Sequence, residues 1–159
     1  MMLPHVGTLT LSLPDETATR RLAERFAEVC RAGDVLLLRG PLGAGKTTFV
    51  DGFSRALGAG AATSPTFVIA HSYPSGRIPL WHLDLYRISG QRAIEELDLE
   101  QYIAPTAITL VEWPEHAPNM WPKSRIEIEL HIGEPGRVAQ IVGFGDSHGT
   151  VAALTPAHE

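Results

Sequence analysis

The chain has 159 residues, the length of one domain, and its 44% apolar and 19% charged residues are typical of a globular protein. A formal net charge of −5, with only two lysines, Lys46 and Lys123, argues against tight binding to a nucleic-acid backbone. The single Cys30 excludes an internal disulfide, and no apolar run is long enough to span a bilayer. We therefore expect a cytoplasmic protein that does not bind membranes.

The first third of the chain predicts a strand, a helix and a second strand. Residues Thr8–Leu13 alternate polar and apolar side chains, as in a half-buried strand. Pro14-Asp15-Glu16 then begins a helix, whose apolar residues recur at helical spacing as far as Cys30. The run Val35–Leu38 is continuously apolar, which is typical of a strand buried on both faces.

After a second apolar helical stripe that ends near Gly58, the chain predicts mainly strands. The expected elements are two strands, a short acidic helix, a buried strand and the two strands of an antiparallel hairpin: Phe67–Tyr73, Ile78–Tyr86, Ala93–Leu99, Ile108–Val111, Arg125–Ile132 and Val138–Val142. The residues after Gly143 are small and polar. We therefore expect one domain at 1–143 and a loosely ordered tail at 144–159.

A glycine-rich loop, Gly40-Pro-Leu-Gly-Ala-Gly-Lys-Thr47, lies between the buried strand and the second helix. It matches the P-loop pattern G-x-x-x-x-G-K-T in the structural context that this pattern requires. The loop's N–H groups and the helix N-terminus would face phosphate oxygens, while Lys46 would reach the β- and γ-phosphates and Thr47 would ligate Mg²⁺. The residues predicted to bind ATP are Gly40, Leu42, Gly43, Ala44, Gly45, Lys46, Thr47 and Thr48.

Two carboxylates lie at or near the ends of predicted strands. Glu112 comes directly after Ile108–Val111, where strand ends line the site in such sheets, and is a candidate Mg²⁺ ligand. The alternative is a carboxylate that caps the strand and faces solvent. Asp84 shares a strand face with His82 and Tyr86 and could act on Mg²⁺ through a water or orient the attacking water, although an ordinary polar face fits the spacing equally well. A metal pair of His82 and Asp84 lacks a third ligand and is set aside.

Four segments together resemble the TsaE family, also called YjeE. They are Gly40–Thr48, Ser64–Phe67, His82–Arg87 and Val111–Pro114, in this order and at family-like spacings, and the likeness runs from about Leu13 to Val142. P-loops are shared by many proteins, so the HxDLYR and VEWP segments make the resemblance specific. Many relatives have Asp where Pro41 stands and Gly near position 98, where this chain has Asp98.

The resemblance implies a bacterial ATPase of tRNA threonylcarbamoyladenosine synthesis. Such a protein binds ATP and Mg²⁺, hydrolyses ATP slowly, and acts as a nucleotide-driven switch on the TsaB–TsaD complex, which transfers the threonylcarbamoyl group. Direct contact with tRNA is not expected. The expected fold is an α/β P-loop NTPase domain with three α/β/α layers and a mixed sheet that is parallel at its centre.

The resemblance also implies roles for individual residues. Thr47 and Glu112 become the expected Mg²⁺ ligands, and Lys46, Asp84 and Glu112 the expected catalytic residues. Further roles follow from the resemblance. Ser64–Phe67 would form a switch loop, Trp113 would lie near the nucleotide, and Arg137 would lie at the base or ribose. The segment Asp15–Thr19, which contains Glu16, would lie near the adenine.

Two other functions stay open from the sequence. A small-molecule P-loop kinase would need an acceptor pocket and an arginine-bearing lid, and the strand-rich second half of the chain predicts no such lid. A module that holds nucleotide without hydrolysing it is the second alternative, and Asp84 and Glu112 argue against it.

Overall fold

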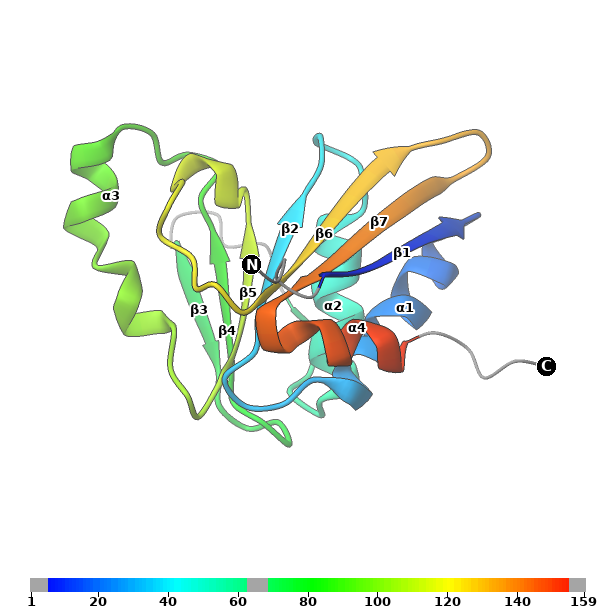
Figure 1. Cartoon of the computed structure of the whole chain (residues 1–159), viewed down its shortest axis with the longest axis horizontal. Helices are drawn as coiled ribbons and strands as arrows, with labels where there is room; N and C mark the ends of the chain where they lie inside the picture. Colours follow the sequence, from blue (N-terminus) through cyan, green and yellow to red (C-terminus); the bar gives the residue numbers. More distant parts are fainter. Residues whose placement is uncertain (1–5, 63–68, 155–159) are drawn as a thin grey trace, which may run out of the picture.

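The computed structural model describes residues 6–62 and 69–154. Within these residues, seven strands form one sheet in the order β1-β7-β6-β2-β5-β4-β3 (Figure 1). The strands are β1 (Val6–Leu13), β2 (Val35–Arg39), β3 (Ala70–Tyr73), β4 (Leu80–Asp84), β5 (Ile108–Glu112), β6 (Arg125–Ile132) and β7 (Arg137–Phe144). The helices are α1 (Glu16–Val29), α2 (Lys46–Ala56), α3 (Gln91–Leu97) and α4 (His148–Ala153), with short 3₁₀ turns η1 (Leu99–Tyr102), η2 (Pro114–His116) and η3 (Gly145–Ser147).

The centre of the sheet is parallel and its outer pairs are antiparallel. Strand β2 pairs in parallel with β5 and β6, and β4 pairs in parallel with β5. The pairs β6–β7, β1–β7 and β3–β4 are antiparallel. This arrangement confirms the expected mixed sheet and the expected hairpin. It also brings the carboxyl ends of four strands to one edge.

Two hydrophobic cores lie on opposite faces of the sheet. Helices α1 and α2 pack over the larger core, where the Phe26 and Phe49 rings meet edge to face with centroids 5.7 Å apart. The smaller core lies beneath α3 and η1, which contribute Ile94 and Leu99. Alternate residues of β2 serve the two cores, because Leu36 belongs to the first and Leu37 to the second. The three-layer α/β/α fold predicted from the sequence is therefore confirmed.

Strand β4 ends at Asp84, two residues before the predicted end at Tyr86. The Asp84 carboxylate accepts the Tyr86 N–H at 3.0 Å, and this local turn takes the chain out of the sheet. On the other side of the hairpin, β3 starts at Ala70. The expected start at Phe67 lies outside the described residues.

The expectation of a loosely ordered tail at 144–159 is wrong for residues 144–154. Phe144 ends β7, η3 packs against β6 and β7, and α4 packs against β1 and β7, with Val151 and Leu154 buried. Gly143 on β7 permits this contact, since a Cβ atom there would lie 2.7 Å from the Ser147 carbonyl oxygen and the Val151 Cγ2. Within the described ranges, no helix has the length and apolar character that crossing a bilayer requires.

Candidate functional site

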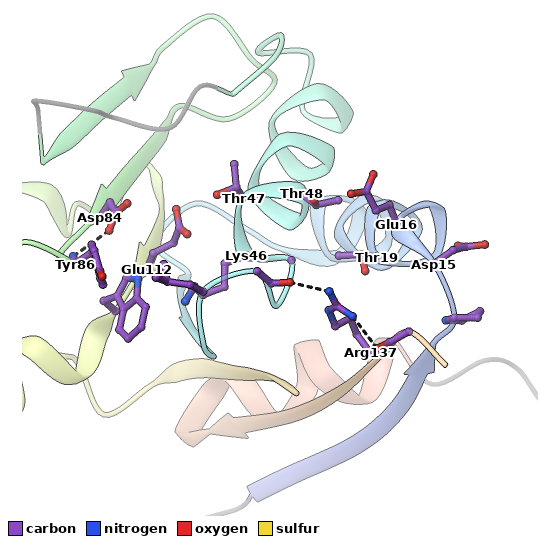
Figure 2. A pocket seen from close by; sticks show the side chains of 16 residues that line it. Asp15, Glu16, Thr19, Lys46, Thr47, Thr48, Asp84, Tyr86, Glu112 and Arg137 are labelled. Atoms are coloured by element: carbon purple, nitrogen blue, oxygen red, sulfur yellow. Dashed lines mark hydrogen bonds between the residues drawn. The ribbon is translucent and has the colours of Figure 1, made fainter. Parts of the chain in front are cut away.

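A pocket of about 470 Å³ lies at the edge of the sheet where the parallel strands end (Figure 2). The P-loop, the start of α1 and the segments that follow β4, β5 and the β6–β7 turn supply its walls. Its lining residues are Pro14, Asp15, Glu16, Thr19, Leu42, Gly43, Gly45, Lys46, Thr47, Thr48, Asp84, Tyr86, Glu112, Trp113, Gly136 and Arg137. The structure thus brings together most of the residues predicted from the sequence.

The P-loop wraps around the start of α2. Gly45 has φ 106° and Gly40 has φ 148°, conformations that side chains rarely adopt. A Cβ atom at Gly40 would also lie 2.6 Å from the Leu130 carbonyl oxygen. Gly40 therefore packs against β6 and does not line the pocket. Ala44 is fully buried and also lies outside the lining. No side chain caps α2, which leaves the N–H groups of its first turn available to an anion.

Lys46, the first residue of α2, is held by its own loop. Its ammonium donates to the Gly40 carbonyl and to the Pro41 carbonyl at 3.5 Å, and it lies 3.8 Å from the centroid of the Trp113 ring. Burial lowers the pKa of Lys46, and the Glu112 carboxylate is the main charge that opposes this shift. The ammonium thus contacts acceptors that phosphate oxygens would replace.

Asp84 and Glu112 end neighbouring parallel strands and are paired in register. Glu112 is only 3% exposed, which contradicts the solvent-facing strand cap that the sequence left open. Burial raises the pKa of Asp84, and the neighbouring Glu112 charge adds to this shift. These two carboxylates lie beside the N-terminus of α2. The pocket therefore holds negative charge next to the positive end of the helix dipole.

Trp113 has a left-handed backbone, with φ 59° and ψ 48°, which is a strained conformation for a bulky side chain. Its ring centroid lies 5.0 Å from that of Tyr86. Sequence reasoning did not assign Tyr86 to the site, which it lines from the turn after β4. Its position two residues after Asp84 was the available signal. Ser64–Phe67, the predicted switch loop, lies outside the described residues.

The opposite end of the pocket is formed by Arg137 and the start of α1 (Figure 2). The Arg137 guanidinium donates to the Gly43 carbonyl at 2.8 Å and to the Gly136 carbonyl at 2.9 Å, so it joins the tip of the P-loop to the β6–β7 turn. Asp15 caps α1 by accepting the Ala18 N–H at 2.8 Å. Glu16 and Thr19 line the same end, and both belong to the segment Asp15–Thr19 that the family resemblance placed near the adenine.

The oxygen donors in the pocket fit Mg²⁺ better than a metal ion whose ligands all come from the protein. Thr47 and Glu112 both line the pocket, and Asp84 lies beside Glu112. The described part of the chain contains no group of three or more His, Cys, Asp or Glu side chains that could enclose a metal. Mg²⁺ commonly takes one or two carboxylates and completes its shell with waters and substrate phosphates.

The sheet order, the loop and the uncapped helix start define the fold class of P-loop NTPases. The sequence model of one family, described as Threonylcarbamoyl adenosine biosynthesis protein TsaE, matches residues 13–139. The chain belongs to the TsaE family.

Individual relatives agree with this family. The chain is 44% identical over 119 residues to the tRNA threonylcarbamoyladenosine biosynthesis protein TsaE of Synechocystis, covering 72% of this chain and 75% of that protein. It is 34% identical over 148 residues to the TsaE protein of Bacillus subtilis, covering 92% and 91%. The crystal structure of Bacillus subtilis YdiB superimposes with a TM-score of 0.74 at 29% identity, covering 96% of this chain and 95% of that chain.

Proposed function

We propose that this protein is a Mg²⁺-dependent ATPase that acts as a nucleotide-driven switch on the TsaB–TsaD complex during threonylcarbamoyladenosine modification of tRNA. One observation carries the ATPase proposal: the uncapped start of α2 and the paired carboxylates Asp84 and Glu112 face the same pocket. The helix start and the loop amides would bind the phosphates. Thr47 and Glu112 would hold Mg²⁺, which neutralises the charge that develops on the phosphates, and Asp84 would orient water.

The position of Arg137 supports slow hydrolysis by the isolated chain. Among the described residues that line the pocket, Arg137 is the one arginine. Its guanidinium donates to two backbone carbonyls at the end of the pocket away from Asp84 and Glu112 (Figure 2). P-loop hydrolases commonly need an arginine near the γ-phosphate, which a partner can supply. The proposed partner complex would therefore speed up hydrolysis as well as respond to it.

The partner proposal is tested by mixing the chain with TsaB and TsaD under ATP, ADP and nucleotide-free conditions, followed by size-exclusion chromatography. A complex whose yield depends on the nucleotide is expected. The Lys46→Met variant is the matched control, since it removes the ammonium that contacts the P-loop and should lose the nucleotide dependence. Absence of co-elution in every condition would contradict the switch.

The catalytic proposal is tested by phosphate release. The Glu112→Gln and Asp84→Asn variants should both release phosphate about 100- to 1,000-fold more slowly than the wild type. Gln and Asn preserve side-chain size, so binding of ATP should be measurable in each.

Incubation with labelled ATP and a metabolite panel tests the kinase alternative, because label appearing on a metabolite would refute the ATPase assignment.

A further inference from the structure

His82 is a fully buried polar side chain that the proposed function does not use. It lies on β4 between Leu80 and Asp84, on the sheet face that packs against the larger core. Its Nε2 lies 2.6 Å from Oε2 of Glu112, and both side chains are at most 4% exposed. The strand register pairs His82 with Leu110, so the imidazole reaches diagonally to the next residue on the same face of β5.

The protonation pattern of the imidazole follows from its two nitrogens. Nδ1 is buried and has no hydrogen-bond partner among the residues that the structure describes. A proton on Nδ1 would be a buried donor without an acceptor, which is costly. The neutral ring therefore carries its proton on Nε2 and donates it to the Glu112 carboxylate.

Packing alone does not explain a histidine at this position. A leucine or methionine would fill a similar space in the larger core without leaving a buried nitrogen unpaired. The imidazole therefore costs some stability, and within residues 6–62 and 69–154 its polar partner is Glu112. This contact fixes Oε2 of Glu112 and leaves Oε1 to meet a ligand in the pocket that Glu112 lines.

The geometry points to His82 as the positioning residue of Glu112: its Nε2–H locks the carboxylate in the rotamer that receives Mg²⁺ or a water bound to it. This inference rests on the proposed function, in which Glu112 is a Mg²⁺ ligand. Residues that orient a metal ligand from behind typically change metal affinity or activity about 10- to 100-fold when they are removed.

The test measures Mg²⁺ coupling, defined as the ratio of the ADP dissociation constants without and with Mg²⁺, by calorimetry. His82→Leu should reduce the coupling about 10-fold or more, while its ADP affinity in EDTA stays at the wild-type value. His82→Gln, whose amide nitrogen can replace Nε2, should restore most of the coupling. If His82→Leu does not fold by circular dichroism, His82→Met makes the same comparison.

Two controls separate positioning from packing. Leu80→Ala loosens the same face of β4 without touching Glu112, so it should lower the melting temperature and keep the wild-type coupling. In a Glu112→Gln background, His82→Leu should cause no further loss of coupling. Wild-type coupling in His82→Leu, or losses that add in the double variant, would overturn the inference. If the wild type itself shows no coupling, the proposed Mg²⁺ site has failed instead.

Discussion

The Lys46 ammonium and the Trp113 ring form a cation–π contact, with 3.8 Å between the nitrogen and the ring centroid. The same ammonium also donates to the Gly40 carbonyl. Phosphate oxygens carry full negative charge, so they compete for Lys46 with these weaker acceptors. Nucleotide binding should therefore separate Lys46 from Trp113, and the indole provides an optical signal for this movement.

The first prediction concerns this signal. In a Trp81→Phe, Trp121→Phe background, Trp113 is the one remaining tryptophan of the chain. Titration with ATP should change its emission, because the ammonium leaves the face of the ring. Lys46→Met in the same background should shift the emission before any nucleotide is added. If emission before ATP is the same with lysine and with methionine, the contact does not exist in solution.

A second prediction concerns Asp84→Asn, which should stabilise the fold while it slows hydrolysis. Burial, aided by the Glu112 charge, raises the pKa of Asp84, so ionising this carboxyl destabilises the folded state. The penalty is absent below the ordinary carboxyl pKa and is complete above the raised one. The free energy of unfolding of Asp84→Asn should therefore exceed that of the wild type by at most about 1 kcal/mol at about pH 7, because the position is only half-buried. At about pH 3 the two free energies should be almost equal. Thermal melts at both pH values test this, and an equal gain at both would exclude an electrostatic cause.

A third prediction concerns the backbone conformation at Asp98. Asp98 ends α3 in the left-handed conformation, with φ 49° and ψ 60°, and places a negative charge at the negative end of the helix. Asp98→Gly should stabilise the protein by about 0.5–1 kcal/mol in urea denaturation, since glycine adopts this backbone without strain. Asp98→Ala removes the charge but keeps the strain. A similar gain in both variants would show that charge, not backbone conformation, causes the effect.

The fourth prediction compares two glycines at α4. Gly143→Ala would place a Cβ 2.7 Å from Val151 Cγ2 and should cost about 1–3 kcal/mol by displacing the helix. At Gly149, within α4, a Cβ would meet no atom within 4 Å. Gly149→Ala should therefore gain up to about 1 kcal/mol through helix propensity. Chemical denaturation of both variants measures the difference, and equal stabilities would mean that α4 does not pack on β7 in solution.

The fold was largely predictable from local patterns. The continuous apolar run of β2, the loop that follows it and the alternation of β6 each depend on neighbouring residues in the chain. The helix α4 was missed because its six residues, His148–Ala153, are mostly small and include one large apolar side chain, Val151. Val151 is buried there only because β1 and β7 provide a surface for it.

The candidate site was predictable as a set of residues and unpredictable as a set of contacts. Lys46, Asp84 and Glu112 could be proposed because each stands at a recognisable place beside a strand or helix end. The contact of His82 with Glu112 depends on the register between β4 and β5, which no local pattern specifies. The contact of Arg137 with Gly43 joins residues 94 positions apart in the chain.

The separation of the two cores by the sheet has a consequence for how the sequence can diverge. Leu36 and Leu37 are adjacent in the chain but pack into different cores, and the P-loop helix α2 contributes only to the larger one. Substitutions more than about 7–10 Å apart without shared partners combine additively. Substitutions within the smaller core that do not touch Trp113 should therefore add to those in the core beneath the P-loop with little coupling. Trp113 is the link between the two sides, because it packs against the smaller core while its ring contacts the Lys46 ammonium.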